Sequence, residues 1–206
     1  NPLFLVPNAL ESQWLERGAR HLASSQGGSA ERPIDVLVQR RKSSPYVLKQ
    51  LVPALKAQGL TVEVQNGWGE DLVDLFNRSK VYLYDSAEYW RGRGVSEGFG
   101  LPPLESLACG CVLFSSFNHA LADSLSPGVT AHQIGQGTLE NDLARVSAAV
   151  ASLHQWRPDP LMIESLLEES SEARWCERWG KVLSQLDDLG AHGALGLASP
   201  LVLRSP

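Results

Sequence analysis

Two glutamates, Glu97 and Glu105, flank a segment rich in glycine and proline, GFGLPPL. Their spacing alone carries little information, because two other glutamate pairs repeat it in a polar helical region. These pairs are Glu164 with Glu172 and Glu169 with Glu177. The residues in between distinguish the first pair, since glycines allow a positive φ and prolines suit the first turn of a helix. The stretch predicts a loop that ends in a helix N-terminus, with Glu97 in the loop and Glu105 in the first helical turn.

The two carboxylates have different tasks if this loop meets a nucleotide. A carboxylate accepts the two adjacent hydroxyls of a ribose well, and Glu105, held by a helix, is the better candidate for that contact. Glu97 lies nearer the reacting end of the ligand, where it binds sugar hydroxyls or stabilises positive charge at an anomeric carbon. The alternatives are a hydrolase with paired carboxylates, a helix-dipole partner at Glu105 and a solvated loop acid at Glu97.

A second candidate site is the basic turn formed by Arg40, Arg41 and Lys42. Ser44 is expected to cap the following helix and Pro45 to occupy its first position. Three cations before a helix N-terminus are unfavourable unless an anion binds between them, and a phosphate or diphosphate is the simplest such anion. The alternative is a solvated basic turn. A simple glycoside hydrolase has no evident use for these cations.

Composition narrows the classes of protein. The chain has 206 residues, 43% of them hydrophobic, which is enough for one core, and its net charge of −5 with no long basic run argues against a nucleic-acid partner. No apolar stretch approaches the roughly 20 residues of a transmembrane segment, and no signal peptide is evident, so we expect a cytoplasmic protein. The three cysteines are expected to be reduced thiols; they are Cys109, Cys111 and Cys176. Their spacing does not predict a metal site.

Apolar runs alternate with helical patterns, which predicts an α/β fold with a Rossmann-like parallel sheet and flanking helices. Helices are expected around 47–55 and 72–76, and over 138–154, 160–169 and 171–188. In the last helix, an apolar face containing Trp175 and Trp179 is expected to dock on the sheet. The expected strands are 34–39, 60–65, 80–84, 111–116 and 129–134.

Ligands of open parallel sheets bind beyond the carboxyl ends of the strands, where the loops converge. The loop 85–95 leads into Glu97 and carries Arg91 and Arg93, which either contact a phosphate or an acceptor or decorate an exposed flap. We favour the flap, because loops of this composition are often mobile. His119 is expected to be an exposed residue at a helix start. The segment 24–31 is expected to be a flexible loop.

The stretch SEGFGLPPLESLACGCVLFSS, at 96–116, closely resembles the signature of retaining glycosyltransferases of family 4 (glycosyl transferases group 1). The family has Glu-Gly-Phe-Gly-Leu-Pro, a second Glu eight residues after the first, and a helix of small residues ending in Ala-Cys-Gly before a strand. Weaker similarity covers most of residues 5–188. It includes LVPNAL near the start, the helix and strand before the signature, and WCERWGKVLSQL near the end.

The resemblance implies the C-terminal, donor-binding half of a GT-B enzyme, in which two Rossmann-like domains close over a cleft. Glu97 would then contact the donor sugar near the reacting carbon, as the catalytic residue, and Glu105 would hold the ribose. The family places an Arg and a Lys about five residues apart in the first loop, whereas the cations here are contiguous. Such enzymes generally need no metal. The residues implied to contact the sugar and diphosphate are Arg40, Arg41, Lys42, Gly98, Phe99, Gly100 and Leu101.

The domain organisation is expected to be a single sugar-nucleotide-binding domain over 1–206, with a linker segment at 1–30 and a tail at 189–206. Because the sequence starts at Asn1 rather than Met, we expect a piece of a longer chain whose N-terminal acceptor domain is missing. The expected function is sugar transfer from a nucleotide-sugar to an unidentified acceptor with retention. The isolated domain is expected to be inactive or incomplete. Two alternatives stay open, a non-catalytic nucleotide-sugar-binding or accessory module and a sugar-nucleotide epimerase of the same fold.

Overall fold

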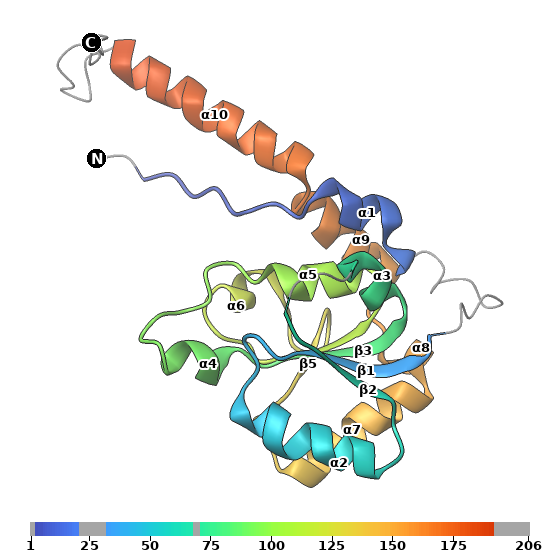
Figure 1. The fold of residues 1–206 in the computed structure, drawn as a ribbon. Coiled ribbons are helices and arrows are strands. Elements are labelled where there is room, and N and C mark those ends of the chain that lie inside the picture. Colours follow the sequence, from blue (N-terminus) through green and yellow to red (C-terminus); the bar gives the residue numbers. More distant parts are fainter. Residues whose placement is uncertain (1–2, 21–31, 68–70, 192–206) are drawn as a thin grey trace.

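The computed structural model describes residues 3–20, 32–67 and 71–191, and within them five parallel strands form one sheet (Figure 1). The strand order is β2-β1-β3-β4-β5. This confirms the predicted α/β class and parallel sheet. All five predicted strands are present, although the last is short. Their bounds are β1 Ile34–Gln39, β2 Val62–Gln65, β3 Ser79–Tyr84, β4 Val112–Ser115 and β5 His132–Gln133.

Helices cover both faces of the sheet (Figure 1). One face carries α1 (Ser12–Arg17), α3 (Leu72–Asn77), α5 (Leu101–Ala108) and α9 (Pro160–Glu169). The other face carries η2 (Val47–Leu51), α2 (Val52–Ala57), α7 (Leu139–Ala151) and α8 (Leu153–Trp156). Two short helices, α4 (Ala87–Arg91) and α6 (Leu121–Ser124), follow β3 and β4. The helix expected over 138–154 is interrupted at Ser152, where the backbone turns to φ −142°.

The alternation of side chains along β3 divides the core between the two faces. Tyr82 and Tyr84 pack on the α5 side, and Val81 and Leu83 pack on the α2 side. Each of these four side chains is at most 2% exposed. Because nearly every position of the central strands β3 and β4 is covered from one side or the other, their sequences are almost continuous apolar runs, as is usual for parallel sheets.

Local signals fix where the helices begin. The Ser44 hydroxyl accepts a hydrogen bond from the Val47 amide at 3.1 Å, which confirms the predicted cap. Asp71 and Thr138 cap α3 and α7 in the same way, by accepting from the amides three residues later. Asp159 accepts from the amide of Leu161 at the start of α9. Each such cap stabilises a helix by about 1 kcal/mol.

The segment expected to be a linker contains α1, and α1 is packed into the domain. Its Trp14 is 5% exposed and lies against Phe76 of α3, with ring centroids 5.7 Å apart. Leu10 forms a backbone bridge with Ser171, which ties this segment to the turn after α9. The predicted loop 24–31 and the tail after 191 lie outside the described residues.

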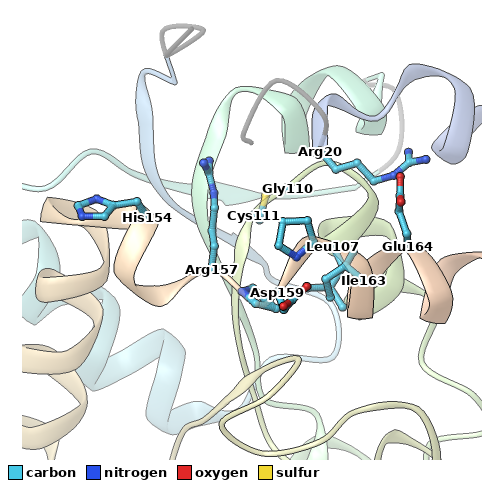
Figure 2. Close-up of a pocket in the computed structure, with 11 residues that line it drawn as sticks. Arg20, Leu107, Gly110, Cys111, His154, Arg157, Asp159, Ile163 and Glu164 are labelled. Carbon is cyan, nitrogen blue, oxygen red and sulfur yellow. The ribbon is translucent and has the colours of Figure 1, made fainter. Parts of the chain in front are cut away.

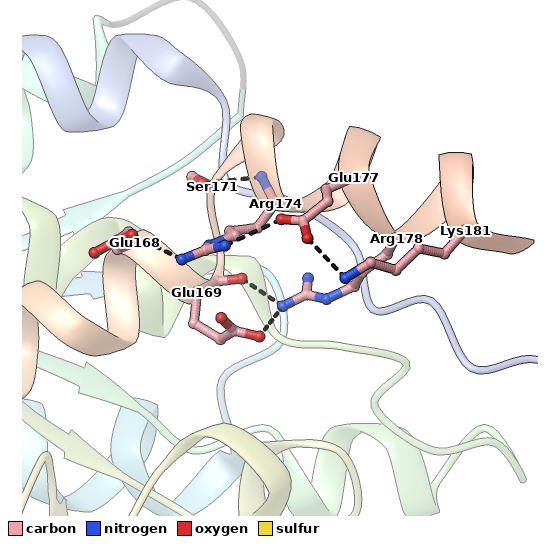
Figure 3. Close-up of polar contacts among 7 residues, drawn as sticks. All are labelled: Glu168, Glu169, Ser171, Arg174, Glu177, Arg178 and Lys181. Atoms are coloured by element: carbon pink, nitrogen blue, oxygen red, sulfur yellow. Dashed lines mark hydrogen bonds and ion pairs between the residues drawn. The ribbon is translucent and has the colours of Figure 1, made fainter.

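The long helix α10 (Glu172–Ala191) does not dock on the sheet as expected. Figure 1 shows α10 projecting away from the sheet. Much of its apolar side is open to solvent, with Trp175 36%, Trp179 39% and Leu183 56% exposed, although Val182 on the same helix is only 9% exposed. Ion pairs join its first turns to the end of α9, among them Arg174 with Glu168 at 3.0 Å and Arg178 with Glu169 (Figure 3). The helical spacing of apolar residues in α10 predicted an apolar face correctly. That spacing does not specify which part of the protein covers the face.

The cysteines are free thiols, Cys109 and Cys111 buried beside β4 and Cys176 exposed on α10. Burial raises the pKa of the Cys111 thiol to about 11, so this thiol stays protonated and packs as a small apolar group. Within the described residues, no helix is both long enough and apolar enough to cross a membrane.

The exposed face of α10 generates a stability prediction. Leu183→Gln is expected to change the free energy of unfolding by less than about 0.5 kcal/mol, because Leu183 is largely in water already. Leu113→Ala, at a residue 1% exposed in β4, is expected to cost about 2–5 kcal/mol. Urea denaturation of both variants measures the difference. A loss of more than about 1 kcal/mol for Leu183→Gln would show that this face is covered.

Candidate functional site

The carboxyl ends of β1 and β3 bring two charged loops together. Lys42 lies in the turn after β1, and Glu97 lies in the loop that leads from α4 to α5. The Lys42 Nζ is 3.4 Å from the Glu97 Oε1, although 55 residues separate them in the chain. The structure thus joins one of the three predicted cations to the predicted catalytic acid.

Glu97 is buried, at 5% exposure, and its carboxylate is held by three donors. The Tyr84 hydroxyl donates to Oε2 at 2.6 Å, and the Trp90 indole N–H donates to the same oxygen at 2.7 Å. Lys42 is the third donor. Glu97 is therefore not the solvated loop acid of the alternative interpretation.

These contacts decide the charge of Glu97. Burial by itself raises the pKa of the carboxyl, but the hydrogen bonds from Tyr84 and Trp90 and the charge of Lys42 together hold the pKa below its ordinary value. The same carboxylate raises the pKa of Tyr84, in addition to the larger effect of burial. Glu97 is thus an anion at neutral pH and Tyr84 a neutral donor.

Sequence reasoning did not find Tyr84 or Trp90. Tyr84 ends a buried strand and resembles any other core aromatic, and Trp90 lies in the loop that was expected to be a flap. In the structure this loop forms α4. The Trp90 indole, rather than Arg91 or Arg93, hydrogen-bonds to Glu97. Arg93 stacks on Tyr89, with its guanidinium carbon 3.8 Å from the ring centroid. The signal in the sequence that could have pointed to this contact is Trp90 itself, a tryptophan seven residues before Glu97.

The three contiguous cations separate in space. The Arg40 Nε donates to Asn66 Oδ1, at the edge of the sheet formed by β2. Lys42 adopts a left-handed backbone conformation, φ 68°, and its Nζ lies 5.1 Å from the centroid of the Trp90 ring as well as beside Glu97. Arg41 is exposed. Left-handed backbone at a residue other than glycine is uncommon, and such residues cluster at functional sites.

The glycine loop enters α5 through Gly100. Gly100 has φ 84°, and a Cβ there would lie 2.2 Å from the Leu121 side chain, so only glycine fits. The side chains of Phe99 and Leu101 pack against the core, and Gly98 is exposed. The predicted prolines occupy the first turn of α5, as expected.

Glu105 is one turn further along α5 than predicted. The helix begins at Leu101 and its first turn contains no acidic residue, because the loop ends at Gly100 rather than at the prolines. Burial raises the pKa of Glu105 to about 7, nearby Glu11 adds to the rise, and Lys42 opposes it. Lys42 thus acts on both glutamates, and the burial of Glu105 is only partly compensated by its surroundings.

His119 precedes α6 and is exposed, as expected, with an unusual φ of 50°. It shares a hollow of about 280 Å³ with Arg91 and Asn118, between α4 and α6. A larger hollow of about 360 Å³ lies at the opposite edge of the sheet, where β4 begins, and Figure 2 shows Arg20, Arg157 and Cys111 among its lining residues. This second hollow is remote from Glu97, because parallel strands keep their starts and ends on opposite edges.

No group of three or more His, Cys, Asp or Glu side chains in the described residues is arranged to hold a metal ion. The absence of a metal requirement stays a prediction.

No family model matches the sequence, and no curated protein matches it either. Solved structures do match the fold. A glycosyltransferase from Rickettsia africae superimposes with a TM-score of 0.63 and 10% identity, over 87% of this chain and 56% of the other. The pneumococcal O-GlcNAc transferase GtfA, in complex with UDP and GlcNAc, superimposes with a TM-score of 0.54 and 18% identity. The match covers 79% of this chain and 37% of GtfA. Anabaena HepE, in complex with UDP-glucose, superimposes with a TM-score of 0.54 and 13% identity. The match covers 74% of this chain and 49% of HepE.

The fold is that of one half of a GT-B glycosyltransferase. The chain spans 37% to 56% of the length of the three structures described above, so it corresponds to only part of each. At identities of only 10 to 18%, the superpositions with TM-scores of 0.54 to 0.63 show the shared fold alone.

Glu105 generates a prediction about stability and pH. Its native pKa of about 7 lies above the ordinary 4.5, so the native state keeps a proton that the unfolded chain releases. The free energy of unfolding should therefore fall by about 1–3 kcal/mol as the pH rises from 4.5 to 7. Glu105→Gln should remove this slope. Urea denaturation at several pH values measures it, with Glu63→Gln on the exposed part of β2 as the control. Equal slopes in wild type and Glu105→Gln would contradict the assigned pKa.

Proposed function

We propose that this chain binds a nucleotide-sugar at the carboxyl edge of the sheet, as the donor half of a glycosyltransferase that retains configuration at the anomeric carbon. The observation that supports this most is the buried, ionised Glu97 beside Lys42, next to the glycine-capped start of α5. A site with one anion and one cation suits a ligand in which positive charge develops at the sugar and negative charge on the departing diphosphate.

The geometry gives each group a task in this proposal. As the bond between the anomeric carbon and the diphosphate oxygen breaks, the Glu97 carboxylate stabilises the positive charge on the sugar ring. Lys42 and the backbone amides of the glycine loop, from Gly98 to Leu101, stabilise the diphosphate, since Pro102 and Pro103 in the first turn of α5 have no N–H. Glu105 accepts the ribose hydroxyls. Its poorly compensated burial is consistent with this role, because a ribose would supply the donors that its surroundings lack.

The electrostatics favour this arrangement over a hydrolase with paired carboxylates. A hydrolase needs one carboxyl protonated as the acid and one ionised, and the two pKa shifts do have opposite signs. However, Lys42 contacts Glu97, which is the ionised carboxylate of the two. A neutral glycoside has no negative group that Lys42 could bind at this position. Two structures of similar fold contain UDP with a sugar or a UDP-sugar, which supports nucleotide-sugar binding.

The isolated chain is proposed to bind donor without efficient transfer. Because it matches about half of the similar glycosyltransferases, the acceptor and the other wall of the cleft are proposed to come from a second domain. Retention and independence of metal are part of the same proposal.

Calorimetry with UDP tests the donor site. Wild type is expected to bind UDP with a Kd below about 1 mM. Glu105→Ala should weaken binding roughly 10- to 100-fold, because two hydrogen bonds to a charged acceptor are lost. Lys42→Ala should weaken it roughly tenfold, whereas Arg40→Ala should change it little, since Arg40 is bound to Asn66. Glu63→Gln serves as the control. No binding of UDP, or of other nucleoside diphosphates, by wild type would rule out the proposed function.

The affinity for UDP should also depend on pH. Ribose hydroxyls donate to the ionised form of Glu105, whose pKa in the free protein is about 7. The Kd is therefore expected to fall roughly tenfold as the pH rises from 6 to 8. Phosphate groups also titrate near pH 6, so the same series with Glu105→Gln corrects for the ligand. Parallel curves for wild type and Glu105→Gln would argue against ribose binding by Glu105.

A further inference from the structure

Trp90 contacts both charged groups of the proposed donor site. Its indole N–H donates to the Glu97 carboxylate at 2.7 Å, and the Lys42 ammonium lies 5.1 Å from the centroid of its ring. One side chain thus binds the anion through its edge and the cation through its face. Trp90 itself is fixed by α4, where its amide donates to the Ser86 carbonyl at 3.1 Å and its carbonyl accepts from Val95 at 3.3 Å.

The two oxygens of Glu97 are unequally occupied. Oε2 accepts two short hydrogen bonds, from Tyr84 at 2.6 Å and from Trp90 at 2.7 Å. A carboxylate oxygen has two lone pairs, so Oε2 is saturated. Among the described residues, Lys42 is the hydrogen-bond partner of Oε1, at a long 3.4 Å, and the nearby Ser86 side chain adds only a smaller stabilisation of the carboxylate. Oε1 therefore has capacity for a further donor.

We propose that Trp90 is a positioning residue for the sugar: it fixes Oε2 so that Oε1 accepts a hydroxyl of the donor sugar. The inference rests on the proposed function and adds that α4 forms the sugar side of the site. The nucleotide itself is held by Glu105 and Lys42. The indole N–H of Trp90 therefore contributes to the affinity for a nucleotide-sugar and not to the affinity for the nucleotide alone, whereas the ring face of Trp90 stays beside Lys42 in both cases.

Trp90→Phe tests this assignment, because phenylalanine keeps an aromatic face for Lys42 and removes the N–H that Glu97 accepts. Calorimetry with UDP and with UDP-glucose gives the ratio of the two affinities. Trp90→Phe is expected to weaken UDP-glucose binding roughly tenfold relative to wild type and to leave UDP binding within about twofold. Tyr84→Phe should have the same selective effect. Tyr89→Phe is the matched control, since Tyr89 lies on the same helix but stacks on Arg93.

The indole N–H resonance of Trp90, assigned by its loss in Trp90→Phe, gives a second readout. It is expected to shift further on addition of UDP-glucose than on addition of UDP, because both ligands reach Lys42 over the Trp90 ring but only the sugar adds a donor to the carboxylate. A purely structural role for Trp90 predicts equal weakening of both ligands in Trp90→Phe, and that result would overturn the inference.

The outcomes separate this inference from the proposed function. If wild type binds UDP but Trp90→Phe keeps the wild-type ratio of affinities, the role of Trp90 is wrong and the donor site stands. If wild type binds neither ligand, the proposed function fails and this inference fails with it.

Discussion

Burying an ionised carboxylate costs several kcal/mol unless donors replace the water that it loses, and this constraint shapes the carboxyl edge of the sheet. Glu97 is 5% exposed and still ionised, because Tyr84, Trp90 and Lys42 supply three donors. Each donor comes from a different segment, so the site exists only when β3, α4 and the turn after β1 are all in place. The depressed pKa of Glu97 is the electrostatic result of that assembly.

The parallel sheet makes this assembly possible. Val38 of β1 pairs with Leu83 of β3, so the two strands end at the same level and their loops project from one edge. Lys42 and Glu97 meet there across 55 residues of sequence. Gly100, with a left-handed φ of 84°, then starts α5 so close to Leu121 that a Cβ at this position would force the Leu121 side chain to move. The position of the second acid, Glu105, follows from where that glycine starts the helix.

The two glutamates show how the surroundings, rather than the residue type, set the charge. Both are shielded from water, yet the pKa of Glu97 is lowered and that of Glu105 is raised to about 7. Glu97 has direct donors, whereas Glu105 has burial, the like charge of Glu11 and only a distant benefit from Lys42. A protein that leaves one acid poorly compensated loses stability at neutral pH. That cost is consistent with the proposal that ribose hydroxyls donate to Glu105.

The sequence by itself determined the parallel sheet, the helix that follows Ser44 and the glycine loop before α5, because strand periodicity, caps and φ preferences are local properties. It also singled out Glu97, Glu105 and the three cations Arg40, Arg41 and Lys42, although not how they are arranged. Only the tertiary structure separated Arg40 from Lys42, and only it brought the Trp90 indole to Glu97. It also showed that α10 projects away from the sheet, although the helical spacing of its apolar residues had led us to expect that α10 packs on the sheet. Hydrogen bonds between segments far apart in the chain depend on register and loop path, and neither residue spacing nor periodicity encodes those.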